Sequence, residues 1–550
     1  MLSLSREVLY LTLVVIHASQ YISPVSATTS SSNPQQRDAA FQHREYARYL
    51  AKRAYITPGQ QSQSYDYVVA GGGLAGLVLA SKLSENGERS VLVVEAGPTG
   101  DEFPTRINVP AETYYNSLLG SMPYDWTYQT VPQPNAGGRR MSQPRGRLLG
   151  GSAAINGMYH VRPSAVEVDT WAALAATDSD PAERWKWSSF FQALKDTETF
   201  TPPGGEALST AGMKYAQDAH GQSGSLKVTY PAYMVPVTGD WLPTLNNAGI
   251  PAIDDAYSGD NIGGFFALST INPSNWTRSY SKSAYIDTLP PRSNLHVLSG
   301  ATVTKIVFAD NVADGARHAS GVEIMTEKGG QVYTVNVDRE VVVSGGAMGS
   351  PHLLMTSGVG PRDVLEAAGV DVKVELPGVG QHLLDHLASG VFWESNVDTQ
   401  GTIRNSGSDF SKSAEFNSFV NSGIAYINGT HLFGSSDAFK SFTDGIMATL
   451  PSVAVPASSS SNGGLVPSAY QEVVEGYKAI FQATAEKIHA TAGLIELLLS
   501  INAPGQIAVQ AALQQPMSHG RVFIGSADYW DGLNIDPGYF SHGAGQSLPF

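Results

Sequence analysis

Residues 65–95 hold an apolar segment, a glycine-rich turn, a helical segment and a second apolar segment that ends on an acid. Tyr65 to Ala70 is short and rich in β-formers, which predicts a buried strand. Gly71 permits the tight turn by which a strand enters a helix. We expect this helix to begin near Leu74 and a second strand to cover residues 90–95. The order strand, helix, strand predicts a βαβ unit of a parallel sheet.

The glycine pattern of this unit also predicts a dinucleotide-binding site. Gly73 has no side chain, so a pyrophosphate can approach the backbone there, and Gly76 lets the helix pack closely on the strand. The free N–H groups of the first helical turn and the helix dipole favour phosphate binding. Glu95 lies 19 residues after Gly76, where a carboxylate can accept hydrogen bonds from ribose hydroxyls. The pattern alone does not distinguish NAD from FAD, and an ordinary strand–helix turn is the alternative.

Length, charge and composition exclude several other classes of protein. With 550 residues the chain has room for roughly three domains, or for two large interleaved ones. A net charge of -15 without clusters of Lys and Arg argues against nucleic-acid binding. The absence of cysteine excludes disulfides, thiolate nucleophiles and cysteine-ligated metals. No run of about 18 apolar residues is present, so we expect a soluble protein without a membrane span.

The first 27 residues predict a secretory signal peptide. Arg6 precedes an apolar segment from Val8 to Ala18, and small residues lead to a cleavage site after Ala27. The apolar segment is too short to be a membrane anchor. We therefore expect a protein that is secreted or lies in the lumen of the secretory pathway, with residues 28–64 as a polar N-terminal arm. Glycosylation sequons, which predict a glycoprotein in that compartment, stand at Asn275 and Asn428.

Patterns near the end of the chain predict further elements. Residues 470–499 carry apolar positions at helical spacing, which predicts a helix. After Pro504, the runs QIAVQAAL and GRVFIGS are typical of strands.

Two longer segments resemble the signatures of the glucose-methanol-choline (GMC) oxidoreductase family. Residues 146–157, GRLLGGSAAING, resemble the first signature, and residues 346–360, GAMGSPHLLMTSGVG, resemble the second at every position. Supporting matches stand at Asp125–Tyr128, Asn294–Val297, Pro377–Gly380 and Asp385-His386. Departures from the family pattern, which leave the required glycines intact and predict tuning of the flavin pocket, occur at Ala153, His160 and His382.

The resemblance implies an α/β (α+β) fold. A Rossmann-type FAD-binding domain is expected to be interleaved with a substrate domain built on an antiparallel sheet with helices. The FAD-binding region would cover residues 65–385, with substrate-domain insertions at about 200–265. Residues 386–550 would form an incomplete C-terminal substrate region.

The resemblance also implies the positions that contact FAD. The pyrophosphate would lie on the glycine turn, at Gly71, Gly73, Leu74 and Ala75, with Gly76 behind it. The adenosine would lie on the end of the second strand and on a later backbone position, at Glu95, Ala96 and Val303. The end of the first signature and the residues after it would run past the isoalloxazine ring, at Asn156, Gly157, Met158 and Tyr159.

The family oxidises alcohols: a hydride passes from the carbinol carbon to the flavin while a histidine base removes the hydroxyl proton. A small-molecule alcohol as substrate, and oxygen or a quinone as electron acceptor, are therefore expected. Fungal members act in secondary-metabolite biosynthesis, and we expect such a role. The metal-site alternative, a pair at His382 and His386, lacks a third ligand, so we predict no metal.

The family's catalytic histidines would follow residues 534–542, and the sequence stops at Phe550. We therefore expect a truncated C-terminal region and assign no catalytic residue. The alternatives to an active oxidoreductase are a catalytically impaired flavin-binding protein and a redox-silent cyclase of the same family.

Overall fold

The computed structural model describes residues 55–116, 118, 120, 122–177, 181–290, 292–309, 317–450, 466 and 468–546. The predicted signal peptide and residues 28–54 of the predicted arm lie outside this range. Among the described helices, none is long and apolar enough to cross a membrane. The domain bounds given above remain predictions.

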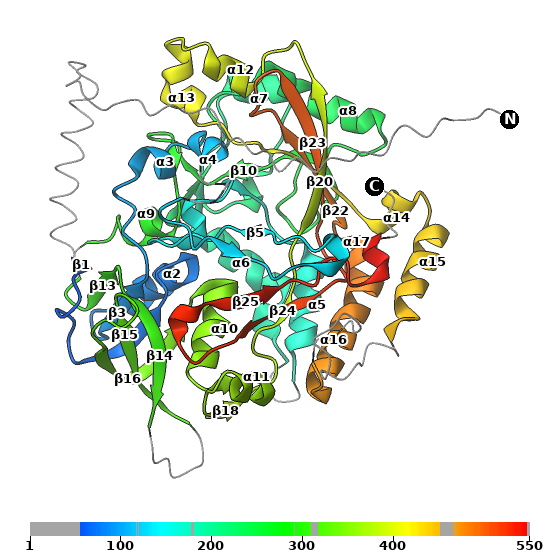
Figure 1. Ribbon diagram of the computed structural model, residues 1–550. Helices are drawn as coiled ribbons and strands as arrows, with labels where there is room; N and C mark the ends of the chain where they lie inside the picture. Colours follow the sequence, from blue (N-terminus) through cyan, green and yellow to red (C-terminus); the bar gives the residue numbers. More distant parts are fainter. Residues whose placement is uncertain are drawn as a thin grey trace. The chain divides into compact units, whose positions relative to one another are not determined.

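A seven-stranded sheet contains the predicted βαβ unit and lies at the lower left of Figure 1. The pairs β1–β13, β13–β3, β3–β2 and β2–β16 are parallel, whereas the pairs β16–β15 and β15–β14 are antiparallel. Helix α2 (Leu74–Leu83) joins β2 to β3, which confirms the βαβ prediction. The strand order is β1 (Tyr55–Ile56), β13 (Leu295–Ser299), β3 (Val91–Glu95), β2 (Ser64–Ala70), β16 (Tyr333–Val343), β15 (Ala319–Met325) and β14 (Thr302–Phe308).

Strands β2 and β3 are buried on both faces of this sheet, as their unbroken apolar runs predict. Val68 and Leu92 belong to the core on one face, whereas Val69 and Val93 belong to the core on the other. Successive side chains of a strand point to opposite faces, so one run of valines fills both cores. Leu77 of α2 completes the second core, and Gly76 beside it permits this close approach of helix and sheet.

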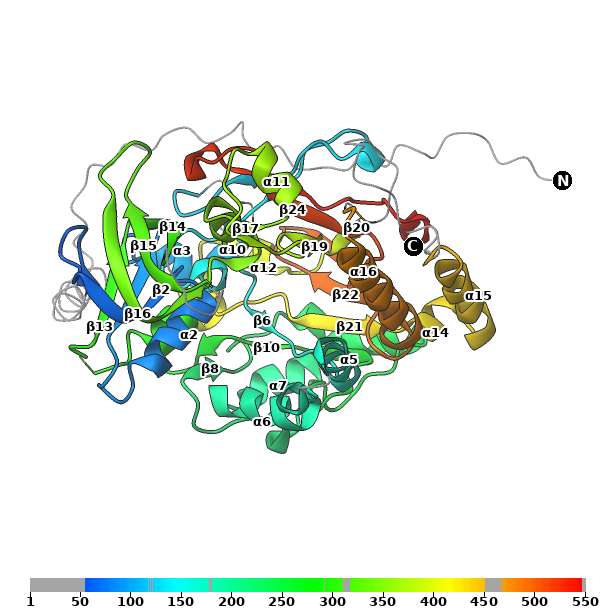
Figure 2. The same cartoon turned by 90° about the horizontal axis from the view of Figure 1, so that it is seen from below.

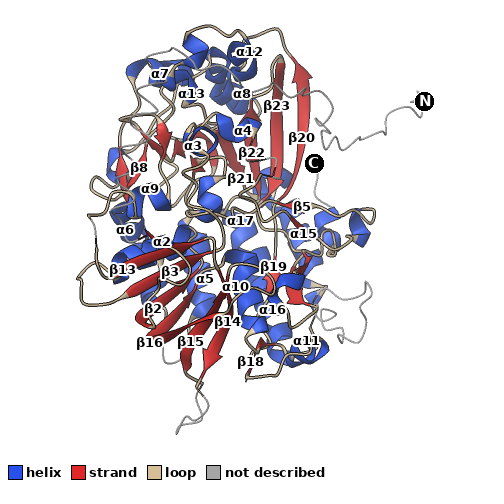
Figure 3. Cartoon of the chain, turned by 60° about the vertical axis from the view of Figure 1, so that its left-hand side comes forward, coloured by secondary structure: helices blue, strands red, loops and turns tan. Residues whose placement is uncertain are grey.

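A second sheet consists of five antiparallel strands and lies in the upper part of Figure 3. Its order is β20 (Leu387–Glu394), β23 (Gln506–Leu513), β22 (Ile495–Ser500), β21 (Gly423–Ile427) and β9 (Gly263–Phe266). Helices α7 (Gly205–Ala211) and α8 (Trp241–Asn247) share a hydrophobic core with this sheet. A parallel sheet with crossover helices and a separate antiparallel sheet confirm the predicted α/β (α+β) fold class.

The prediction of one helix over residues 470–499 is wrong at its end. Helix α16 (Gln471–Ala483) continues through a π-helical turn and stops with α17 (His489–Thr491). Residues 495–500 instead form β22, because pairing with β21 and β23 on both sides outweighs the helical spacing of the apolar residues. The two predicted strands are confirmed as β23 and β24 (Gly520–Ile524). Figure 2 shows α16 next to α5 (Ala165–Ala175).

Candidate cofactor site

A cavity of about 580 Å³ opens at the carboxyl ends of β2 and β3. This is the position at which open α/β sheets bind ligands. The cavity wall combines the turn after β2, the end of β3, parts of residues 145–156, the start of β14, the start of helix α10 (Gly346–Thr356), and Tyr529. The predicted FAD-contacting residues that line it are Gly71, Gly73, Leu74, Ala75, Glu95, Ala96, Asn156 and Val303.

The glycine turn leaves backbone exposed to this cavity. Gly71 has a φ of 111°, and a Cβ at this position would lie 2.5 Å from the carbonyl oxygen of Ser344. A Cβ on Gly76 would collide with the carbonyl oxygen of Gly71, so Gly76 serves helix–strand packing and does not line the cavity. Gly73 is the N-cap of α2 and has no side chain to bond the first amides of the helix. These amides therefore remain available for a phosphate.

Glu95 is only 6% exposed and lines the cavity from the end of β3. Its two carboxylate oxygens accept hydrogen bonds from the backbone N–H groups of Gly72 and Gly97, both at 2.9 Å. Burial raises the pKa of Glu95 to about 7, although both N–H donors and Arg147 act in the opposite direction. The two amides fix the carboxylate in place, and each oxygen keeps a lone pair that a ribose hydroxyl can use.

A second helix begins at the same cavity. Residues 346–350 at the start of α10 line the cavity, and the N-cap is Gly345, again without a capping side chain. The positive ends of two helix dipoles, those of α2 and α10, are therefore directed at one ligand site. Sequence reasoning assigned no contact to α10, although its glycine-rich start, GGAMG, carries the same kind of signal as the first turn.

Aromatic side chains complete the wall. Trp126 and Tyr128 lie parallel, with ring centroids 5.6 Å apart, and the guanidinium of Arg147 lies 5.2 Å from the Trp126 ring. Tyr529 stacks on His352 of α10 at 4.0 Å, and burial raises the pKa of its hydroxyl. Tyr529 reaches the cavity from the far end of the sequence, and sequence reasoning missed it because no local pattern marks it.

A buried arginine holds the loop that carries Asn156. Arg278 donates to the side-chain oxygen of Asn156 at 2.8 Å, and also to the backbone oxygens of Ile107 and Ala153 at 2.8 and 3.1 Å. Arg278 is 2% exposed, and burial lowers its pKa to about 10, which still leaves it charged at neutral pH. Sequence reasoning missed this residue, since it lies outside the recognised segments.

Besides Gly76, three predicted residues do not line the cavity: Gly157, Met158 and Tyr159. The carbonyl oxygen of Gly157 accepts a hydrogen bond from the hydroxyl of Tyr114 at 2.7 Å. Met158 is 1% exposed, and the Tyr159 hydroxyl faces Glu496 of β22 in the second sheet. Contact of these residues with the isoalloxazine ring remains a prediction.

Among the described residues, no histidine lines the cavity. His352 lies behind the wall, where it stacks on Tyr529, and burial lowers its pKa to about 4. The imidazole of His382 stacks on Tyr477 at 3.7 Å. Within the described part of the chain, no group of three or more His, Cys, Asp or Glu residues is placed to hold a metal ion.

Known proteins share both the sequence pattern and the fold. Residues 65–388 match the family model described as GMC oxidoreductase. The chain is 37% identical over 481 residues to the GMC oxidoreductase family protein Mala s 12 of Malassezia sympodialis, which covers 87% of this chain and 74% of that protein. It is 35% identical over 332 residues to dehydrogenase mpl7 of Monascus purpureus, with 60% of this chain and 51% of that protein covered.

Among solved structures, an FAD-dependent oxidoreductase from Chaetomium thermophilum matches with a TM-score of 0.78 and 25% identity, over 88% of this chain and 80% of that one. The cavity fits the cofactor of this family, FAD, because two helix N-termini, an unobstructed backbone at Gly73 and an anchored Glu95 surround one space. The predicted family and cofactor are therefore confirmed, and the chain belongs to the GMC oxidoreductase family.

Proposed function

We propose that this chain oxidises a CH–OH group of a small-molecule alcohol to a carbonyl, as an FAD-dependent oxidoreductase. The observation that carries the proposal is the 580 Å³ cavity between two helix N-termini, with Glu95 on its wall. When bound, FAD supplies a hydride acceptor. Family membership and the similarity to dehydrogenase mpl7 support oxidation as the reaction.

The chain's own residues bind and orient the cofactor in this proposal. The amides at Gly73, Leu74 and Ala75 would hold the pyrophosphate, because the first helical turn has no other partners for them. Glu95 would accept the ribose hydroxyls. Arg278 would keep Asn156 in position at the cavity wall, because its guanidinium bonds both the side chain and the backbone of that residue.

The finer parts of the proposal rest on the sequence. Oxygen or a quinone would take up the electrons, and the protein would act in secondary-metabolite biosynthesis. It would be secreted or remain in the lumen of the secretory pathway, as the leader and the sequons at Asn275 and Asn428 indicate.

The flavin absorbance band at about 450 nm provides the test. Protein loaded with FAD is mixed anaerobically with a panel of primary and secondary alcohols, and oxygen or a quinone is then added. Bleaching by at least one alcohol, followed by recovery with the acceptor, is the expected result. If FAD binds but no alcohol bleaches the band, alcohol oxidation is contradicted.

The second candidate is a flavin-binding protein with impaired turnover, and the absence of a histidine from the described cavity wall favours it. Loss of a general base commonly costs about 10²–10⁴-fold in rate. Added imidazole can replace such a base from solution. Bleaching that appears only with imidazole would support this candidate, whereas bleaching by alcohol alone would argue against it. A redox-silent cyclase would convert its substrate without any change in absorbance.

A further inference from the structure

A second cavity, of about 420 Å³, shares Tyr529 with the candidate cofactor site. Its wall comes from β14, β15, the end of α10, the loop after α11 (Arg362–Ala367) and the segment around Trp530. Tyr529, whose ring stacks on His352, lines both cavities. The volume lies within the range of small-molecule pockets.

Two opposite charges stand side by side in this cavity. Lys305 and Glu323 are direct cross-strand partners in the antiparallel pair β14–β15. Neither side chain forms an ion pair with another described residue. The remaining acids of the wall do have partners, since Asp528 lies 3.1 Å from Lys328 and Asp371 lies 3.9 Å from Lys373. Among the described residues of the wall, Lys305 and Glu323 therefore remain available to a charged ligand.

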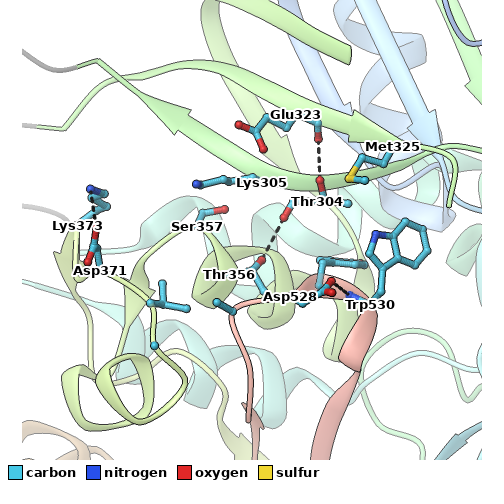
Figure 4. A pocket seen from close by; sticks show the side chains of 14 residues that line it. Thr304, Lys305, Glu323, Met325, Thr356, Ser357, Asp371, Lys373, Asp528 and Trp530 are labelled. Carbon is cyan, nitrogen blue, oxygen red and sulfur yellow. Dashed lines mark hydrogen bonds and ion pairs between the residues drawn. The ribbon is translucent and has the colours of Figure 1, made fainter. Parts of the chain in front are cut away.

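The opposite end of the cavity is apolar. Figure 4 shows Trp530 and Met325 together at one end, with Lys305 directed toward the other. The indole N–H of Trp530 is buried and has no hydrogen-bond partner in the described part of the structure. A ligand acceptor that reaches this group would gain a hydrogen bond that the described residues do not provide.

The C-terminal end of helix α10 at this cavity disfavours the binding of phosphates. Thr356 is the last residue of α10 and Ser357 its C-cap, so the negative end of the helix dipole meets the cavity. This end favours an ammonium group and disfavours a phosphate. The cavity is thus electrostatically the reverse of the cofactor site, where helices begin.

We propose that this cavity is a second ligand site, and that it binds a small zwitterion with an apolar group, of the α-amino-acid class. The carboxylate would pair with Lys305, the ammonium would pair with Glu323, and the apolar group would lie on Trp530 and Met325. The site is independent of the proposed oxidoreductase activity, so each can fail without the other.

Isothermal titration of the full chain with three probes of similar shape tests the charge pattern. The zwitterion L-phenylalanine is expected to bind at least tenfold more tightly than 3-phenylpropionate, which lacks the ammonium, and 2-phenylethylamine, which lacks the carboxylate. L-Leucine and L-methionine serve as further zwitterions. The proposal is overturned if none of the three amino acids binds at millimolar concentration, or if either single-charge analogue binds as tightly as L-phenylalanine.

Variants locate the binding. Lys305→Met and Glu323→Gln are each expected to lower the affinity for L-phenylalanine at least tenfold. The exchange Lys305→Glu with Glu323→Lys is expected to restore most of this affinity. The matched control is Lys440→Met with Asp444→Asn, an exposed ion pair of 2.7 Å on α15 (Ser436–Met447), which should change nothing. Equal affinity in the cavity variants and the control, with unchanged unfolding midpoints, would refute the assignment.

Discussion

Gly73 exposes its backbone to the cavity, and a Cβ at this position would find its nearest neighbour, the Cα of Gly151, at 3.8 Å. The protein itself can therefore accept Gly73→Ala, whereas a pyrophosphate that must approach the backbone cannot. We expect the variant to keep its unfolding midpoint but to bind FAD at least about tenfold more weakly, which corresponds to ~1.4 kcal/mol. Isothermal titration with FAD measures the affinity.

The matched control for this prediction is Gly205→Ala at the start of α7, where an added Cβ meets no atom within 4 Å. It should leave both stability and FAD affinity unchanged. If Gly73→Ala bound FAD as the control does, the pyrophosphate would not lie on this turn.

Glu95 links the stability of the cofactor-free protein to pH. Burial raises its pKa from 4.5 in the unfolded chain to about 7 in the folded protein. Between these values the folded state binds more protons, so the contribution of Glu95 to stability falls as the pH rises from 4.5 to 7. Glu95→Gln removes this proton uptake. We expect the stability of the variant relative to the natural protein to rise across this window by at most about 3 kcal/mol.

Urea unfolding of both proteins at pH values of about 5 and 7.5 measures this difference. Only the change with pH is informative, because Gln also loses one of the two backbone hydrogen bonds at every pH. Parallel pH profiles for the two proteins would show that Glu95 ionises in the folded state as it does in water.

At the scale of elements, the region of α16 and α17 buries two histidines, and their effect on the pH dependence of stability is opposite to that of Glu95. His489 and His519 are 2% and 5% exposed, and burial lowers the pKa of each to about 4. The unfolded chain protonates first as the pH falls below about 6.5, so their contribution to stability is present above this value and is lost toward pH 4. At a pH of about 5, each histidine should lower the free energy of unfolding by about 2 kcal/mol relative to neutral pH.

The double variant His489→Gln with His519→Gln tests this expectation. In a Glu95→Gln background, which removes the opposing titration, the free energy of unfolding should fall less between neutral pH and a pH of about 5 than it does with both histidines present. An equal loss in both proteins would place the acid sensitivity elsewhere in the fold.

The elements that could be predicted are those whose signal is local. The turn at Gly71 and Gly73, the helix that follows and the strand ending on Glu95 lie within one short segment, and each residue there restricts its neighbours. Residues 495–500 show the limit of such reasoning, because their apolar spacing suits a helix while two neighbouring strands make them a strand. That outcome is decided by partners distant in the sequence.

At the scale of the whole molecule, the same limit applies to the site. Arg278 positions Asn156, and Tyr529 closes the cavity, yet neither belongs to a segment with a recognisable pattern. Residues 157–159 continue a recognised signature but turn away from the described cavity wall. The segments with a recognisable pattern were therefore predictable, whereas Arg278 and Tyr529, which only the fold brings to the site, were not.

The cavity joins segments that are far apart in the sequence, so a ligand that fills it must stabilise all of them together. Hydrogen exchange measured with and without FAD tests this coupling. We expect slower exchange in wall segments that are far apart in the sequence, at residues 71–75, 94–96, 126–128, 145–156, 301–303 and 343–350 and at Tyr529. Strands β20 and β23 should exchange equally in both states, and the effect should weaken in Gly73→Ala. Protection confined to residues 71–76 would instead indicate that only a phosphate group is held, because a dinucleotide that fills the cavity would also contact the wall residues of α10 and β14.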